Sequence, residues 1–239
     1  MTGAIAAHDA GLTALVVEKA AFFGGSTALS GGGIWMPNNP VLTSIGRGDD
    51  PADVRRYLQE VVGDRVSPAR LDAYVEQGPE ALEMLHRVSG RMDFSWCPDY
   101  SDYHPELPGG RPEGRTIEPR PIDAKLLAED EEHLLPASLP SPMGLWFTGS
   151  EGRRLMLFRR TWSGKWMIRV AAWRVVSNLF RRRHMKTLGA SLVVRLRLTM
   201  KDLGLPLWLN SPITELVVED GQVVGAVVRR DGRTVRVRA

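Results

Sequence analysis

The stretch "LVVEKAAFFGGSTALSGGGIW", residues 15–35, decides the fold of this chain. It continues an apolar run, LTALVV at residues 12–17, that ends in the acid Glu18. A short continuous apolar run is typical of a strand buried on both faces in a parallel sheet. Two glycine clusters follow, at residues 24–25 and 31–33, with hydroxyl residues between them. The pattern therefore predicts a strand, an acid at its carboxyl end and then a glycine-rich loop.

Glu18 stands where the ribose-binding acid of a dinucleotide fold would stand. In a βαβ dinucleotide unit, an acid at the end of the second strand binds the adenosine ribose, about 20 residues after a glycine-rich turn that holds the pyrophosphate. Residues Thr2 to Ala10 predict a helix that Gly11 ends. This helix would begin directly after the third glycine of such a turn. We therefore expect the first strand and the phosphate-binding glycines to lie upstream of Met1.

The glycine-rich loop at residues 24–33 offers backbone N–H groups that no side chain shields. Together with its serine and threonine hydroxyls, these groups can approach anionic phosphates or the polar edge of a ring. For the glycine pair at 24–25 alone, a mobile loop is the alternative. The preceding strand, acid and lysine together favour a ligand cradle. The predicted cofactor-binding residues are Glu18, Lys19, Gly24, Gly25, Ser26, Thr27, Ser30, Gly31 and Gly32.

Helical spacing dominates residues 50–87. Asp50 precedes Pro51, and Ser67 precedes Pro68. A capping side chain followed by proline is a helix start signal, because proline at the first helical position gives up only an N–H that has no partner within the helix. We therefore predict two helices that begin at these two prolines.

The rest of the chain changes character twice. Residues 92–142 are rich in proline, glycine and aspartate, which predicts a long loop. Residues 153–204 form a basic helical region, and residues 205–239 predict strands joined by tight Asp-Gly turns. We expect nucleotide-binding α/β parts at residues 1–46 and 205–239, with a helical and loop insertion at residues 47–204.

Length, charge and cysteine content exclude several classes of protein. The chain has 239 residues, a net charge of +3 and one cysteine, Cys97, so an internal disulfide is excluded and a reducing compartment is favoured. No apolar run approaches the roughly 20 residues of a membrane span, and the N-terminus lacks a secretory signal pattern. The 5 histidines are scattered without paired ligand spacing, which predicts no metal site. We expect a cytoplasmic enzyme.

Three segments resemble one known family. They are LVVEKAAFFGGSTALSGGGIWMPNN at residues 15–39, YSDYHPELPGGRPEGRTIEPRP at residues 100–121 and LPLWLNSPITELVVEDGQVVGAVV at residues 205–228. They look like flavoproteins related to fumarate reductase and succinate dehydrogenase, and most closely like the 3-ketosteroid Δ1-dehydrogenase branch. The resemblance implies an α/β fold with a Rossmann-like FAD-binding domain, FAD as cofactor and a steroid as substrate. It also implies that Glu18 binds the ribose, and that the glycine loop lies along the pyrophosphate and flavin.

The implied oxidoreductase reaction removes two hydrogens from C1 and C2 of a 3-ketosteroid. One leaves as a proton to a tyrosine base and the other as a hydride to flavin N5. By resemblance, Tyr103 matches the active-site tyrosine of a DY motif, and Tyr100 takes the neighbouring aromatic position of the steroid pocket. Tyr103 and Tyr100 are therefore the predicted catalytic residues. The alternative is that both tyrosines pack a loop, with their hydroxyls in water.

The chain departs from the family at both ends. The family's substrate-capping domain, its tyrosine base and the residues that polarise the 3-keto group match positions beyond Ala239. We expect an incomplete piece that lacks the capping domain and the first strand, binds FAD weakly or not at all, and is inactive alone. A fumarate-reductase-like ene reductase and a non-catalytic remnant that binds membrane surfaces are the alternative functions.

Residues 153–186 include only neutral and basic residues. Trp162, Trp166, Trp173 and Phe180 alternate with arginines there, as in an amphipathic helix that lies on an anionic membrane. For an enzyme of lipid-soluble sterols, peripheral contact at the inner membrane face would make sense. The alternative is a solvated face with the tryptophans in the core. Nucleic-acid binding is disfavoured, because no recognised module accompanies the charge.

Overall fold

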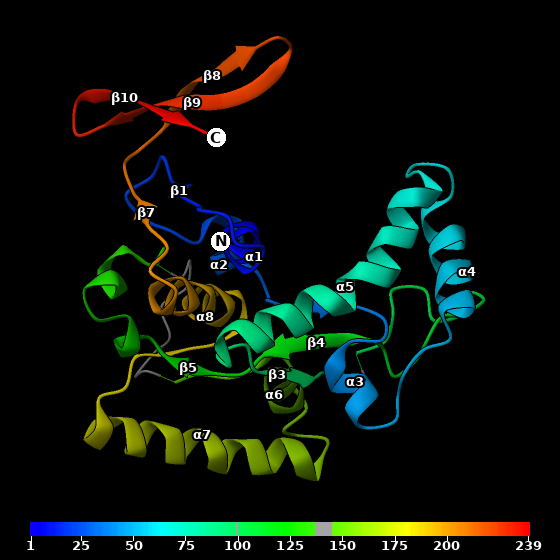
Figure 1. The fold of residues 1–239 in the computed structure, drawn as a ribbon. Coiled ribbons are helices and arrows are strands. Elements are labelled where there is room, and N and C mark those ends of the chain that lie inside the picture. Colours follow the sequence, from blue (N-terminus) through cyan, green and yellow to red (C-terminus); the bar gives the residue numbers. More distant parts are fainter. Residues whose placement is uncertain (99, 137–144) are drawn as a thin grey trace.

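The computed structural model describes residues 1–98, 100–136 and 145–239. Figure 1 shows α8 beside α1, α2 and α5, with α3 and α4 beyond α5, a β-sheet at one end and α7 along the opposite edge. The helices are α1 Thr2–Asp9, α2 Gly25–Leu29, α3 Pro40–Ser44, α4 Pro51–Val62, α5 Pro68–Ser89, the 3₁₀ helix η1 Ala124–His133, α6 Gly149–Met156, α7 Trp162–Arg181 and α8 Leu188–Asp202. The strands are β1 Val16–Val17, β2 Ile34–Trp35, β3 Phe94–Trp96, β4 Thr116–Pro119, β5 Ile122–Asp123, β6 Met185–Lys186, β7 Leu207–Trp208, β8 Ile213–Glu219, β9 Gln222–Arg230 and β10 Arg233–Arg238.

The N-terminal helix and the parallel strand are present, but the strand is shorter than predicted. α1 ends next to Gly11, which has a φ of 79°. β1 pairs in parallel with β7, so the parallel arrangement is confirmed. The prediction of a doubly buried strand over residues 12–17 is wrong, because Leu12 is exposed and β1 is half-buried. Within the described residues, β1 pairs with β7 alone. Each of these strands has two residues, so few backbone hydrogen bonds hold β1 in a sheet.

α8 lies at the centre of the molecule and buries nine of its residues. It buries Val194 and Leu198 against Phe23 and Leu127, and Met200 against Ile5 on α1. These contacts join the N-terminal elements to η1 and α5 through one helix. α8 therefore fixes the position of the glycine loop that follows β1.

The two helices with proline starts are confirmed. α4 begins at Pro51, and the Asp50 carboxylate accepts a hydrogen bond of 2.8 Å from the Ala52 N–H. α5 begins at Pro68, as predicted, although the Ser67 side chain makes no capping hydrogen bond. It is capped at its other end by Gly90, which adopts the left-handed conformation that glycine tolerates best. These boundaries were predictable because both ends of each helix are set by local backbone chemistry.

Residues 92–142 contain more regular structure than the predicted long loop. β4 lies between β2 and β3 in an antiparallel sheet, and β5 pairs with β6. β4 is buried along its whole length. Its four residues carry no alternating pattern, and their burial comes from partners distant in sequence. Residue 99 and residues 137–142 of this stretch lie outside the described residues.

The C-terminal strands and their turns are confirmed. β8, β9 and β10 form an antiparallel sheet in the order β10-β9-β8. The turns lie at Asp220-Gly221 and Asp231-Gly232, and all four residues have positive φ angles between 49° and 78°. Asp-Gly pairs adopt this backbone readily and match the twist of a hairpin. Figure 1 shows this sheet at the end of the molecule opposite α7.

The predicted basic helical region is present and consists of three helices, α6, α7 and α8. Trp162, Trp166 and Trp173 of α7 are 85%, 60% and 68% exposed, so they do not enter the core. The inward face of α7 instead buries Gly164 and Met167. No helix in the described ranges combines the length and the apolarity that crossing a bilayer requires.

Candidate active site

The glycine loop contains glycines with two different structural roles. A side chain at Gly32 would collide with the backbone of Leu188 and Gly189, at the start of α8. Gly32 therefore allows the loop to pack directly on this helix. Gly32 also has a φ of 67°, a backbone conformation that favours glycine. By contrast, a side chain at Gly25 or Gly31 would meet no atom within 4 Å. These two glycines border open space, as a ligand cradle requires.

The hydroxyl residues of the loop also differ. Ser30 Oγ donates to the Thr27 carbonyl at 2.8 Å and accepts from the Gly32 N–H at 3.1 Å. Its hydroxyl therefore holds the shape of the loop. Ser26 and Thr27 lie on α2 and are exposed, so their hydroxyls are accessible to a ligand.

Glu18 lies directly after β1, as predicted. Its N–H donates to the Trp208 carbonyl at 2.8 Å, and its own carbonyl accepts from the Ser211 N–H at 2.8 Å. One carboxylate oxygen, Oε1, accepts from the Ala20 N–H at 2.9 Å. The side chain is thus fixed at the carboxyl end of a parallel strand, where nucleotides bind in open α/β sheets. Lys19 beside it is exposed.

One cavity brings the glycine loop together with the tyrosine loop. It has a volume of about 270 Å³ and is lined by Ser30, Gly31, Gly32 and Gly33 on one side. Tyr100, Ser101 and Tyr103 line it on the other side, with Trp35 and Thr116. Glu18, Lys19, Gly24, Gly25, Ser26 and Thr27 do not line this cavity. The structure therefore joins three of the predicted cofactor residues with both predicted tyrosines.

Strand β4 explains why these two loops meet. It pairs on one side with β2, which directly follows the glycine loop, through Trp35 and Thr116. On the other side it pairs with β3, which leads into the tyrosine loop, through Trp96 and Ile117. Ile34 and Trp96 both lie opposite Ile117, so the start of β2 and the end of β3 flank the same short stretch of β4.

The two tyrosines have different environments. Tyr103 is 87% exposed and Tyr100 is 38% exposed. Burial raises the pKa of Tyr100, and the neighbouring Tyr103 hydroxyl raises it further. The Arg153 guanidinium, 4.7 Å from the centre of the Tyr100 ring, opposes this rise without cancelling it. Tyr100 therefore stays protonated at neutral pH and is suited to donate a hydrogen bond rather than to accept a proton.

A buried ionic cluster fixes the tyrosine loop. Asp102, between the two tyrosines, is buried and ion-paired with Arg115. Its carboxylate also accepts from Trp35 Nε1 at 2.7 Å and from the Arg111 N–H at 2.9 Å. Arg115 Nε lies 2.8 Å from an oxygen of Asp49, and the side chains of Arg115 and Asp49 are each only 1% exposed. The loop is therefore anchored at the residue next to Tyr103.

Sequence reasoning missed this cluster. Asp102 and Arg115 lie 13 residues apart in a segment predicted as irregular, and neither sits in a periodic pattern. The available signal was a carboxylate enclosed by two tyrosines, followed by an arginine directly before β4. Among the described residues, no three His, Cys, Asp or Glu side chains converge on one point that could hold a metal ion.

Comparison with known proteins places this site in context. The family model described as FAD binding domain matches residues 1–239. The 3-oxosteroid 1-dehydrogenase of Mycolicibacterium smegmatis is 40% identical over 234 residues, which are 96% of this chain and 40% of that protein. The 3-oxosteroid 1-dehydrogenase of Mycobacterium tuberculosis is 40% identical over 229 residues, again 96% of this chain and 40% of that protein.

A solved structure agrees with these relatives. The crystal structure of 3-ketosteroid delta1-dehydrogenase from Sterolibacterium denitrificans, in complex with 1,4-androstadiene-3,17-dione, matches with a TM-score of 0.86 and 32% identity. The match covers 99% of this chain and 43% of that chain. The predicted α/β FAD-binding fold is therefore confirmed. The chain spans about two fifths of the length of the relatives that it matches.

Proposed function

The chain belongs to the FAD binding domain family, and from this premise we propose that it is the FAD-binding part of a 3-ketosteroid Δ1-dehydrogenase. The single observation that carries the proposal is the cavity shared by the glycine loop and the two tyrosines. The names of the relatives, at 40% identity, support the substrate class. The activity is that of the whole protein, to which this chain contributes the cofactor site and one wall of the substrate site.

The residues of the glycine loop fit FAD. Gly25 and Gly31 border open space, so their N–H groups can approach a phosphate or a ring edge without steric conflict. The exposed hydroxyls of Ser26 and Thr27 add two donors on the same short helix. The Glu18 carboxylate would accept hydrogen bonds from the ribose hydroxyls. FAD, when bound, supplies the two-electron acceptor for the hydrogen that leaves the steroid as hydride.

The tyrosines serve the steroid side of the site. Protonated Tyr100 donates a hydrogen bond and forms an aromatic wall, while exposed Tyr103 presents its hydroxyl to the substrate. The anchored Asp102 between them holds both phenols at the cavity. The chain thus orients the steroid ring beside the glycine loop, and the second hydrogen leaves as a proton to a tyrosine base.

Steroid dehydrogenation by the protein expressed from its whole reading frame tests this proposal. We expect bound flavin in the purified protein and formation of the Δ1 product from a 3-ketosteroid with a dye as electron acceptor. Tyr103→Phe should lower kcat/KM about 100-fold without loss of flavin, because it removes a hydroxyl that assists proton transfer to the tyrosine base of the whole protein. Glu18→Gln should weaken FAD binding about tenfold, because it removes a charged hydrogen-bond acceptor. Flavin-free protein, or fumarate reduction in place of steroid oxidation, would refute the proposal.

The exposed face of α7 favours a second role, docking on an anionic membrane surface. Trp162, Trp166, Trp173 and Phe180, which we term the α7 stripe, are 85%, 60%, 68% and 84% exposed. Residues 153–186 hold 11 lysines and arginines and no aspartate or glutamate. Aromatic residues at the headgroup level, surrounded by basic residues, are the pattern of an interfacial helix. Docking would give a dehydrogenase access to steroids dissolved in lipid.

Vesicle co-sedimentation tests the docking role. We expect the protein to bind vesicles that contain an anionic lipid, and binding to fall at least about tenfold when Trp162, Trp166 and Phe180 are changed to alanine. Leu216→Ala with Val218→Ala is the matched control, because these side chains are 55% and 57% exposed on β8, at the other end of the molecule. Equal losses for both variants would contradict a specific α7 surface.

A further inference from the structure

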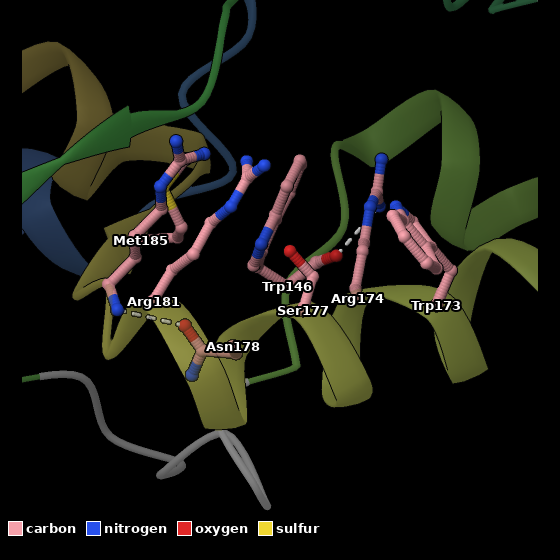
Figure 2. A pocket seen from close by; sticks show the side chains of 8 residues that line it. Trp146, Trp173, Arg174, Ser177, Asn178, Arg181 and Met185 are labelled. Carbon is pink, nitrogen blue, oxygen red and sulfur yellow. Dashed lines mark hydrogen bonds between the residues drawn. The ribbon is translucent and has the colours of Figure 1, made fainter.

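A second cavity, of about 180 Å³, lies beside α7 and is lined mainly by basic and aromatic side chains. Arg174, Ser177, Asn178 and Arg181 reach it from α7. Their spacing of three and four residues places them on one face of the helix. Trp146 forms part of the opposite wall, and Figure 2 shows its ring between Arg174 and Arg181.

The turn at the end of α7 adds a further arginine to this cavity. Arg182 has a φ of 45° and ends the helix in the left-handed conformation. Its N–H donates to the Asn178 carbonyl at 2.8 Å. The next N–H, of Arg183, donates to the Asn178 side-chain oxygen at 3.0 Å. The chain therefore folds back on α7, and Arg183 joins Arg181 at the cavity.

The charges in this cavity are only partly compensated. Arg174 is paired with Glu151, at 2.6 and 2.9 Å, and its guanidinium stacks 3.6 Å from the centre of the Trp146 ring. Within the described ranges, Arg181 and Arg183 have no carboxylate within ion-pair distance. The Ser177 hydroxyl and the Asn178 amide N–H₂ are polar groups on the same wall. Two unmatched guanidiniums beside neutral donors form a site for a phosphate, whose oxygens accept several such bonds at once.

Trp173 connects this cavity to the α7 stripe. Its side chain lines the cavity and is also 68% exposed among the aromatic residues that face outward. The cavity thus adjoins the α7 stripe at Trp173. Building on the docking role proposed above, we propose that this cavity binds the phosphate of an anionic phospholipid headgroup, with Arg181 and Arg183 as its charged ligands.

Binding to two kinds of anionic vesicle tests the proposal with the protein from its whole reading frame. Vesicles of a neutral galactolipid, which has no phosphate, carry either phosphatidylglycerol or oleate at equal surface charge. Only the phosphatidylglycerol vesicles then contain phosphate, because oleate has a carboxylate in its place. We expect the protein to prefer the phosphatidylglycerol vesicles. Arg181→Gln with Arg183→Gln should weaken that binding about tenfold or more, the effect of losing charged hydrogen bonds, and abolish the preference.

Two further variants separate the phosphate contact from net charge. Arg181→Lys with Arg183→Lys keeps the charge but loses the two-pronged geometry, so binding should persist with a reduced preference. Arg233→Gln with Arg236→Gln removes the same charge from β10, distant from α7 in Figure 1, and should leave the preference unchanged.

The outcomes distinguish this proposal from the docking role. Failure to bind any anionic vesicle would overturn both. Binding without a preference for phosphatidylglycerol over oleate would overturn the phospholipid assignment and leave the docking role intact. A titration with inorganic phosphate, monitored by the fluorescence of Trp146 and Trp173, distinguishes a lipid phosphate from a soluble one. Saturable binding of inorganic phosphate without any vesicle preference would identify a soluble anion as the ligand and overturn the lipid assignment.

Discussion

Replacement of Arg115 by methionine should loosen the tyrosine loop, because Arg115 is the central cation of the buried cluster. Its side chain is 1% exposed and pairs with Asp49 and Asp102, whose side chains are 1% and 0% exposed. Methionine fills much of the same volume but leaves both carboxylates without this partner. Removal of one member of a buried ion pair costs about 3–5 kcal/mol, since the remaining charge stays buried.

This cost can be measured by urea unfolding followed by tryptophan fluorescence. For a slope of about 3 kcal/mol per molar urea, the upper end for small proteins, the midpoint should fall by about 1–1.7 M. Asp102→Asn should cost less, about 1.5–3 kcal/mol, because it removes one charged acceptor and keeps the shape of the side chain. Hydrogen exchange should rise first at residues 100–114, which the cluster holds in place.

Arg120→Met is the matched control for this prediction. Arg120 pairs with Asp93 at 3.2 Å, but their side chains are 57% and 55% exposed. Exposed pairs contribute about 0–1 kcal/mol, so the midpoint should barely move. Equal decreases of the midpoint in Arg115→Met and Arg120→Met would show that the buried cluster does not hold the tyrosine loop.

Three further predictions concern the glycine loop, the cysteine and the ion pair between Glu151 and Arg174. Gly32→Ala should destabilise the protein by about 1–3 kcal/mol, because the new methyl group would collide with the backbone of α8. Gly31→Ala, whose methyl group would meet no atom within 4 Å, should leave the melting temperature unchanged and lower the flavin content. Burial raises the pKa of Cys97 to about 11, so iodoacetamide should alkylate this thiol slowly in native protein and rapidly in urea at mildly alkaline pH. Burial alone would raise the pKa of Glu151, but its hydrogen bonds, chiefly from Arg174, leave it below the usual 4.5. The pair's stabilisation is therefore present above about pH 4.5 and lost as the pH falls, and in Glu151→Gln the acid side of the pH–stability curve should be flatter.

The elements predicted best are those whose ends depend on neighbouring residues. Asp50-Pro51 and Ser67-Pro68 began two helices, and the two Asp-Gly pairs formed two hairpin turns. In each case the backbone angles follow from the side chain or the missing N–H at that position. Tertiary contacts were not needed to specify them.

The elements predicted poorly depend on partners distant in the sequence. β1 is shorter and more exposed than its apolar run suggested, since a strand is buried only where other strands and helices cover it. β4 was missed, because four residues without alternation have no local signal and gain their burial from β2 and β3. The sequence could not decide whether the tryptophans of α7 lie in the core or on the surface. Helical spacing shows that they share one face of the helix, but not whether that face points inward or outward.

For the candidate site, the sequence by itself determined the kind of residue and its local frame. It identified Glu18 after a strand, a glycine loop with hydroxyls and a pair of tyrosines, because each is encoded within a few consecutive residues. Only the tertiary structure decided that the glycine loop and the tyrosines share one cavity, through the pairing of β4 with both β2 and β3. It also decided that Arg183 returns to the cavity beside α7, after the turn at Arg182. These long-range contacts depend on which apolar surfaces bury one another. The free energy of that burial comes from the packing of the whole chain and cannot be assigned to any short segment.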